Sequence, residues 1–259
     1  MNPILSPDPN LFAGSITTFV CNQATITPSI TLSAGAPTPI WTVTETGGAV
    51  FTYTTAGFTH NRVTAGDMTV RLLNTQALKT YVAKFECPGD GIKSTWAGLH
   101  LELFTKITAI DVNGNALLSG NISSFRLPAS LATFAVNITS VSGDISGWVL
   151  PALLMNFYVN ATSVNGATVF TSAVALRDFR YQNCGLPQAT VDAIALAVYT
   201  RRAAFTYATP SMNIGGTNAA PSGVYADEDP PVTGKGAIYE IVNDPEVEGF
   251  KKWAVIYTA

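Results

Sequence analysis

A repeated spacing of apolar residues is the feature that most restricts how this chain can fold. Four segments carry apolar residues at relative positions one, four and six, and they start at Ile107, Leu131, Leu154 and Leu176. The starts are 24, 23 and 22 residues apart (131 − 107, 154 − 131 and 176 − 154), within the roughly 20–29-residue period of leucine-rich repeats. One such unit cannot bury its apolar side alone, so successive units stack around a shared core. The sequence therefore predicts a mainly β fold containing a short leucine-rich-repeat-like solenoid with a parallel sheet, and four ordinary strands of a β-sandwich are the alternative.

Each unit also carries a small polar residue, or a cysteine, eight positions after its start. In a stacked coil this side chain points inward where the backbone turns and bonds backbone groups that would otherwise be unpaired. A buried amide without a partner costs about 1–3 kcal/mol. We expect the four side chains to form one internal column, the slot column. Its members are Asn115, Thr139, Thr162 and Cys184.

The residues that alternate with the core positions point outward and should share one sheet face. Along the stack this face changes from small side chains to aromatic and charged ones. Tyr158 beside Arg180 has the composition of a binding hot spot. We interpret the face as a binding surface, with a plain solvated sheet face as the alternative. Its predicted binding residues are Thr133, Asn156, Tyr158, Asp178 and Arg180, and Ala135 lies on the same face.

The last unit changes character, as expected for the cap of a stack. Val191, Ile194 and Val198 are spaced three and four residues apart, which predicts an amphipathic helix. Pro187 suits the first turn of that helix. Strands are predicted at 211–214 and 253–257, and residues 236–242 are predicted to form a short helix or strand. Residues 105–259 are therefore one solenoid domain with a C-terminal capping unit.

The N-terminal part is predicted to fold differently. Residues 39–104 are expected to form a small antiparallel β cap or anchor domain, with candidate strands at 40–43, 50–54, 68–73 and 79–85 and a Gly47-Gly48 hairpin turn. Residues 1–38 are rich in Pro, Thr and Ser and are expected to form an extended arm with one strand at 15–21. The N-terminus lacks a basic region followed by an apolar one, so no secretory signal is predicted.

Residues of the C-terminal part also resemble a known family. The matching segments are Cys184-Gly185-Leu186, residues 188–194, the run Gly-Gly-Thr-Asn-Ala-Ala-Pro-Ser at 215–222, and Trp253-Ala254-Val255. They resemble a leucine-rich-repeat-like domain of tailed-bacteriophage virion proteins and bacterial surface proteins, over roughly residues 105–259. The insertion at 225–231 and Lys252 before Trp253 depart from that family.

The resemblance implies a non-enzymatic virion component: a capsid- or tail-associated surface protein of decoration or fibre type, located on the particle. Its partners would be other virion proteins and copies of itself. The alternative is a receptor-binding or adhesin module that recognises a glycan or protein receptor on the host surface.

Composition agrees with an assembled or β-rich protein and excludes some classes. Charged residues make up 12% of the chain, against roughly 25% in ordinary domains. Such a surface suits burial in a larger assembly, or an extracellular β-rich protein. The net charge is −3 and no basic run occurs, so nucleic-acid binding is not expected. No apolar run reaches the roughly 18 residues of a membrane span.

No motif predicts catalysis, a metal site or a cofactor. His60 is expected in a loop and His100 on a strand, and neither has a partner at metal-ligand spacing. Asp227, Glu228 and Asp229 match no EF-hand and are interpreted as a solvated acidic loop. An enzyme such as a depolymerising tailspike is the least favoured class. For Cys21, Cys87 and Cys184 we favour buried free thiols, with a Cys21–Cys87 bridge as the alternative.

Overall fold

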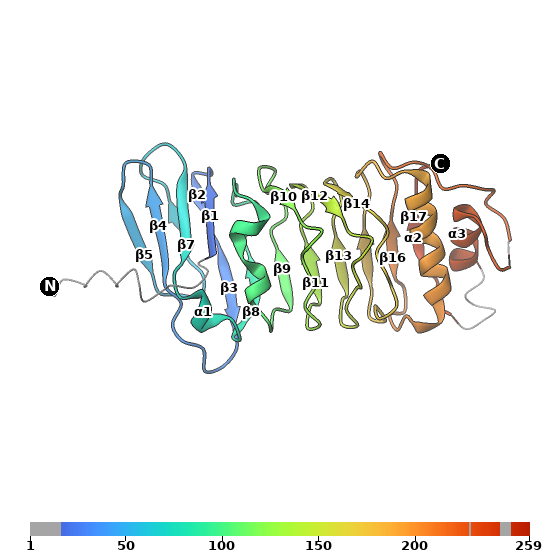
Figure 1. Ribbon diagram of the computed structural model, residues 1–259, viewed down its shortest axis with the longest axis horizontal. Coiled ribbons are helices and arrows are strands. Elements are labelled where there is room, and N and C mark those ends of the chain that lie inside the picture. Colours follow the sequence, from blue (N-terminus) through green and yellow to red (C-terminus); the bar gives the residue numbers. More distant parts are fainter. Residues whose placement is uncertain (1–16, 228, 244–249) are drawn as a thin grey trace.

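The computed structural model describes residues 17–227, 229–243 and 250–259 and shows an elongated stack of coils (Figure 1). An N-terminal antiparallel sheet lies at one end, and helices α2 and α3 lie at the other. An eight-stranded sheet runs along the stack in the order β17-β16-β15-β13-β11-β9-β8-β3, parallel except for β3. Its strands are β3 (Ser29–Leu32), β8 (Val82–Glu86), β9 (Ala109–Asp111), β11 (Thr133–Ala135), β13 (Asn156–Tyr158), β15 (Asp178–Arg180), β16 (Ser211–Asn213) and β17 (Ala254–Ile256).

Each coil contributes one core residue to the same row of this sheet. Ile110 pairs with Phe134, Phe134 with Phe157, and Phe157 with Phe179. The three phenylalanine rings stack with centroids 5.8 and 5.2 Å apart. Because side chains alternate between the faces of a strand, the neighbours of these residues point outward. This in-register stacking confirms the solenoid that the apolar spacing predicts.

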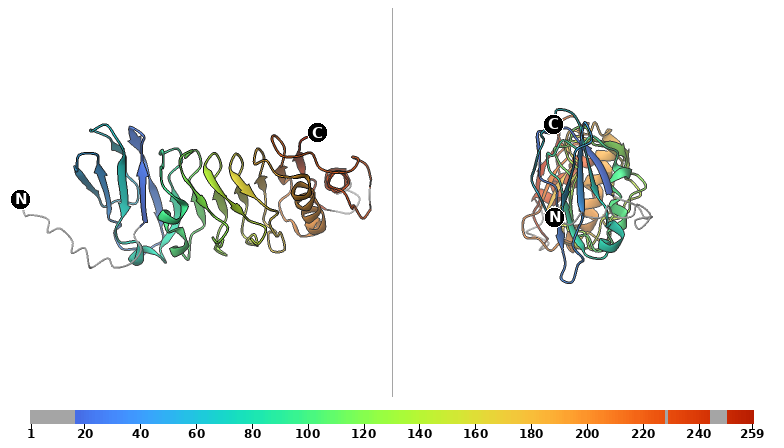
Figure 2. Two further views of the ribbon diagram at one scale, coloured as in Figure 1. Left: turned by 45° about the horizontal axis from the view of Figure 1, so that its top comes forward. Right: turned by 90° about the vertical axis from the view of Figure 1, so that its left-hand side faces the viewer.

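A second, three-stranded parallel sheet closes the coils on another side. It consists of β10 (Ser119–Asn121), β12 (Ser140–Asp144) and β14 (Ser163–Asn165). Gly143 has φ 132°, and a Cβ there would lie 2.6 Å from Asn121 Oδ1 of the previous coil. This position of β12 therefore requires glycine both for its backbone conformation and for the close approach of the neighbouring coil. Viewed along the stack, the coils lie behind one another (Figure 2).

The stack begins one coil before the first predicted unit. β8 pairs in parallel with β9 and places Phe85 beside Ile110. Val82, Phe85 and Cys87 are all buried and repeat the one–four–six spacing. The main sheet therefore crosses the predicted boundary between residues 104 and 105, and β8 belongs to this sheet rather than to the N-terminal one.

The segment around His100 differs from its prediction. The alternation of Leu99, Leu101 and Leu103 predicts a strand, but residues Trp96–Leu99 and Leu101–Leu103 form the short 3₁₀ helices η2 and η3. His100 lies between them at φ 49°, and this left-handed residue turns the chain so that Leu99 and Leu101 are both buried.

The N-terminal sheet has the order β1-β7-β4-β5, and all of its pairings are antiparallel. β4 (Trp41–Glu45) and β5 (Val50–Tyr53) form the predicted hairpin, with Gly47 and Gly48 at φ 99° and 90°. β7 (Met68–Leu72) is also as predicted. Trp41 and Val70 of the N-terminal sheet are fully buried.

Residues 17–38 form three strands instead of an extended arm. β1 (Thr17–Cys21) confirms the strand predicted there within the described residues. β3 joins the main sheet, and Phe19, Ile26 and Ile30 are buried. The alternating apolar residues of this segment therefore outweigh its prolines. Residues 1–16 of the predicted arm lie outside the described part of the chain.

The C-terminal elements cap the stack. α2 (Gln188–Arg201) confirms the predicted helix, with Pro187 at the position just before it. α3 (Gly234–Asn243) packs against α2. Residues 236–242, which were predicted to form either a short helix or a strand, are therefore helical. The remaining elements are β2 (Thr25–Ile26), β6 (His60–Asn61), α1 (Thr75–Leu78) and η4 (Arg202–Ala204).

The three cysteines are free thiols, with Cys21 and Cys87 buried and Cys184 partly buried. Within the described residues, no helix has the length and apolar character that crossing a membrane requires.

Candidate binding face

The slot column satisfies backbone groups inside the coils, and Asn115 and Cys184 also bond the preceding coil. Asn115 is fully buried. Its Nδ2 donates to Val112 O of its own coil and to Cys87 O of the preceding coil, both at 2.8 Å. Its Oδ1 accepts from Ile92 N at 2.8 Å. One side chain thus satisfies three backbone groups in two coils.

The other predicted slot residues bond fewer groups. Thr139 Oγ1 donates to Val136 O, and Thr162 Oγ1 donates to Val159 O, each at 2.6 Å. Cys184 Sγ lies 3.2 Å from Val159 O of the preceding coil. Burial is the main reason that the pKa of the Cys184 thiol is raised, so the thiol stays protonated and acts as a weak donor.

Sequence reasoning missed one further residue at each end of this column. Asn218 accepts from Cys184 N and Leu186 N, and donates to Tyr181 O and Ile214 O, at 2.8–3.1 Å. It stands one residue later in its coil than the regular slot. At the other end Asp90 Oδ1 accepts from Thr27 N at 2.8 Å. A one–four–six search started at Val82 would have found Asp90.

A left-handed residue precedes each slot, and one of these residues is strained. In αL, glycine is unstrained and asparagine is tolerated, whereas a β-branched side chain is an outlier. Ile138 adopts φ 57°, and 52% of its surface is exposed. The equivalent residues are Gly89, Gly114, Ala161 and Asn183, with φ between 54° and 73°.

The open face of the main sheet carries a second polar column, the tyrosine–aspartate–arginine network. The parallel register pairs Asn156 with Asp178 and Tyr158 with Arg180. Asp178 Oδ2 accepts from Tyr158 OH at 2.9 Å and from Arg180 Nε and Nη2 at 3.0 and 2.8 Å. Asp178 Oδ1 accepts from Ser211 Oγ at 2.9 Å. Both carboxylate oxygens are therefore occupied within the protein.

Hydrogen bonds join all five predicted binding residues. Asn156 Nδ2 donates to Thr133 Oγ1 at 3.2 Å, and Tyr158 OH lies 3.4 Å from Asn156 Oδ1. The Arg180 guanidinium lies over the Tyr158 ring at 4.8 Å from its centroid. The tyrosine ring is thus covered, so Tyr158 positions Arg180 instead of offering a free aromatic surface.

The electrostatics of this network favour the ionised Asp178–Arg180 pair. Burial alone would raise the pKa of Asp178, but hydrogen bonds from Arg180, Ser211 and Tyr158 outweigh it and lower that pKa. Burial, together with the bond to Asp178, raises the pKa of Tyr158 to about 12. At neutral pH the network therefore contains one carboxylate, one guanidinium and a neutral phenol.

An open groove of about 270 Å³ lies beside this network, over strands β15, β16 and β17. We call it the β15–β17 groove. Polar side chains of β15 and β16 line one side of it, and apolar ones of β17 line the other. The lining residues are Asp178, Arg180, Gln182, Ser211, Met212, Asn213, Ala254 and Ile256. The lining residues of β16 and β17 were missed because those strands follow a helix or a long connection, where the repeat period is lost, and Gln182 was missed because it lies just after its strand.

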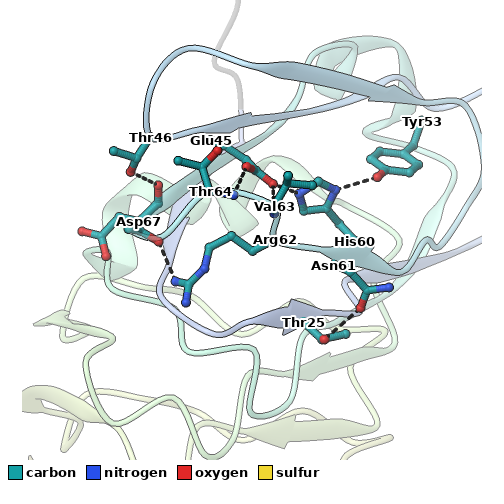
Figure 3. A network of polar contacts seen from close by, with 11 residues as sticks. Thr25, Glu45, Thr46, Tyr53, His60, Asn61, Arg62, Val63, Thr64 and Asp67 are labelled. Atoms are coloured by element: carbon teal, nitrogen blue, oxygen red, sulfur yellow. Dashed lines mark hydrogen bonds and ion pairs between the residues drawn. The ribbon is translucent and has the colours of Figure 1, made fainter.

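A separate polar network joins the N-terminal sheet to the two-stranded sheet of β2 and β6 (Figure 3). His60 is not in a loop as predicted: it lies on β6 and is only 3% exposed. Its Nε2 donates to Glu45 Oε1 at 2.9 Å, and its Nδ1 lies 2.7 Å from Tyr53 OH. Glu45 also accepts from Val63 N and Thr64 N, at 2.8 and 2.7 Å.

These bonds fix the loop after β6 to the end of β4. The backbone N–H of Val63 is the largest of the causes that lower the pKa of Glu45 to about 2, with Thr64 and His60 adding to it against the effect of burial. His60 lines none of four surface grooves of the protein, including the one over β15–β17. We interpret this network as structural.

His100 lies elsewhere, with Nδ1 3.2 Å from Glu102 Oε1 at the surface. In the described ranges, no three His, Cys, Asp or Glu side chains converge as metal ligands would.

Comparison of the chain with protein-family models, curated proteins and solved structures gave no match. Its function is therefore inferred from the residues and their geometry.

Proposed function

We propose that this protein is a non-enzymatic structural component of a tailed-bacteriophage particle, associated with the capsid or the tail. It would lie at the particle surface and act through contacts with other virion proteins and with copies of itself. The tyrosine–aspartate–arginine network carries this proposal. Its hydrogen bonds cross β11, β13, β15 and β16 and hold outward side chains in fixed positions on a rigid sheet.

Such a face suits burial against a protein. The Asp178 and Arg180 charges compensate each other within the chain. Burying a charge that already has its partner avoids the penalty of an unpaired buried ion. Fixed side chains also lose little entropy when a partner covers them. The low charged fraction of 12% and the family resemblance of residues 215–222 support the same function.

The test uses particles of the phage whose genome encodes this chain. Mass spectrometry of purified particles should detect the protein, and absence from them would refute the proposal. The tagged Tyr158→Ala/Arg180→Ala double variant should enter particles at least tenfold less than wild type, because it removes the centre of the face. Arg126→Ala is the matched control, since Arg126 is exposed away from that face and bonds only nearby carbonyl oxygens.

The β15–β17 groove favours a second function, a receptor-binding or adhesin module that recognises the host surface. A pocket with convergent polar groups beside an apolar wall is typical of ligand sites. Under this function the solenoid holds the groove at a distance from the N-terminal sheet, which would anchor the protein. Binding of the purified chain to host cells, lost in Tyr158→Ala/Arg180→Ala, would distinguish it from the first function.

A further inference from the structure

We infer that the β15–β17 groove binds a neutral sugar ring, an inference that rests on the second function, recognition of the host surface. The sheet register builds the site. Asp178, Ser211 and Ala254 form one outward row, and Arg180, Asn213 and Ile256 form the next. Three strands thus present charge, amide and hydrocarbon to one small volume.

Charge compensation selects against an ionic ligand. Asp178 accepts four hydrogen bonds, three of them on the oxygen that faces Arg180 and Tyr158. An anion that approached Arg180 would also meet the Asp178 carboxylate, and a cation would meet the guanidinium. A neutral polar ligand faces neither repulsion.

Several polar groups of the groove are left for such a ligand. Gln182 lines the groove and is half-buried; its Oε1 is enclosed and has no partner among the described residues, so the exposed part of its amide is the NH₂ group. Asn213 Oδ1 accepts from Gly215 N at 3.2 Å, which leaves its NH₂ group to donate. Arg180 has five N–H groups, and only Nε and Nη2 point to Asp178. Ser211 Oγ donates its hydrogen to Asp178 and so remains an acceptor. The site therefore offers both donors and an acceptor, as sugar hydroxyls require.

The opposite wall provides the apolar surface that the C–H face of a sugar ring needs. Ile256 is 62% exposed, and Ala254 is exposed beside it. The volume of about 270 Å³ lies just below the roughly 300–1,000 Å³ of pockets for drug-sized ligands. One ring fits such a groove, and the rest of a glycan would continue into solvent.

The positioned arginine lowers the cost of binding. Asp178 holds Arg180 from one side, and the Tyr158 ring supports it at 4.8 Å. A side chain that is fixed before binding loses less conformational entropy when the ligand arrives. Tyr158 is therefore a positioning residue, and Arg180, Asn213 and Gln182 contact the sugar.

The test titrates the full chain with the methyl glycosides of glucose, galactose, mannose, rhamnose and N-acetylglucosamine, followed by NMR. Glucuronic acid and N-acetylneuraminic acid are the charged comparisons. We expect at least one neutral glycoside to bind with a Kd of about 1 mM, typical of a single small group (about −4 kcal/mol). Gln182→Leu and Asn213→Leu should each weaken that binding at least tenfold.

Asn160→Leu is the matched control. Asn160 is the residue one coil before Gln182 in the same column, its Oδ1 also has no partner among the described residues, and it does not line the groove. Its variant should bind sugar as wild type does. Binding of only the acidic sugars, no binding up to roughly 100 mM, or equal binding by the groove variants would each overturn the inference.

Particle incorporation separates this inference from the first function. If sugar binding fails while the protein enters particles, only the groove ligand is wrong. If the chain binds sugar and is absent from particles, the virion function is wrong and the inference that the groove binds sugar stands.

Discussion

The two polar columns of the same coils differ in what their side chains bond. Slot residues bond almost entirely to backbone, as Asn115 does with Cys87 O, Val112 O and Ile92 N. Residues of the open face bond mainly to one another, as Tyr158 and Arg180 do with Asp178. Backbone partners exist in every coil, so the inner column is a requirement of the fold. Side-chain partners are a choice of this particular sequence, so the outer column points to function.

The largest effect should come from the inner column. Asn115→Leu leaves three backbone groups in the core without partners, each worth about 1–3 kcal/mol, so we expect a loss of about 3 kcal/mol or more in the free energy of unfolding. Urea denaturation monitored by circular dichroism measures it. Asn137→Ala, an outward asparagine one coil later, should cost less than about 0.5 kcal/mol. Equal losses in the two variants would show that the slot residue contributes no more to stability than an asparagine outside both columns.

The next effect concerns acid stability, which should come partly from the N-terminal sheet because the predicted slot residues contain no carboxylate. The pKa of Glu45 is lowered from 4.5 to about 2 in the folded protein. Ionised Glu45 therefore stabilises the fold above pH 4.5, and this contribution disappears as the pH falls towards 2. Glu45→Gln should be less stable than wild type at neutral pH, with a difference that closes between these values. A difference independent of pH would contradict this role, and urea midpoints over the pH series measure it.

A smaller effect, of opposite sign, should come from the left-handed positions. Ile138→Gly relieves a strained β-branched residue, worth roughly 1–2 kcal/mol, and loses part of that to chain entropy. We expect a net stabilisation of about 1 kcal/mol, visible as a raised Tm. Asn183→Gly is the comparison and should not raise Tm: asparagine tolerates φ 59°, so little strain is relieved, and the bond that Asn183 Oδ1 accepts from Thr217 N at 3.1 Å is lost. Destabilisation by Ile138→Gly would show that the contacts of this side chain stabilise the fold by more than its backbone strain costs.

The smallest stability effect is expected on the open face. Asp178→Asn breaks a partly exposed ion pair, which costs less than about 1 kcal/mol, yet it should release Arg180 from its position. The pKa of Tyr158, about 12 in wild type, should fall because the Asp178 charge and strong hydrogen bond are lost. Absorbance titration at alkaline pH measures it, with Asn156→Ala as the control. A loss of stability as large as that of Asn115→Leu would make the outer column structural too.

The central coils were predictable because their order is local. The spacing of apolar residues is regular along the sequence in this part, at Ile110, Phe134, Phe157 and Phe179. Units with such a spacing bury their apolar sides by stacking. The coil from Val82 was missed because it falls before the recognised repeat, within the segment assigned to the cap.

The candidate binding face was predictable only where the period holds. The alternation within repeats placed Tyr158, Asp178 and Arg180 on one face. It could not predict that these three side chains bond to one another. The groove joins residues from β15 to β17, which are separated by α2 and α3 along the chain. His60 and Glu45 lie in two different sheets, whose packing depends on tertiary structure, so no spacing rule would bring them together.

In-register stacking has a consequence for how such a protein can change size. Each coil meets its neighbours through one row of apolar side chains and through parallel strand pairing, so a whole coil inserted between β9 and β13 would find a matching interface on both sides. The insertion would move the β15–β17 groove farther from the N-terminal sheet without altering the groove or the sheet. The number of coils therefore sets the distance between the N-terminal sheet and the groove, independently of the residues that line the groove.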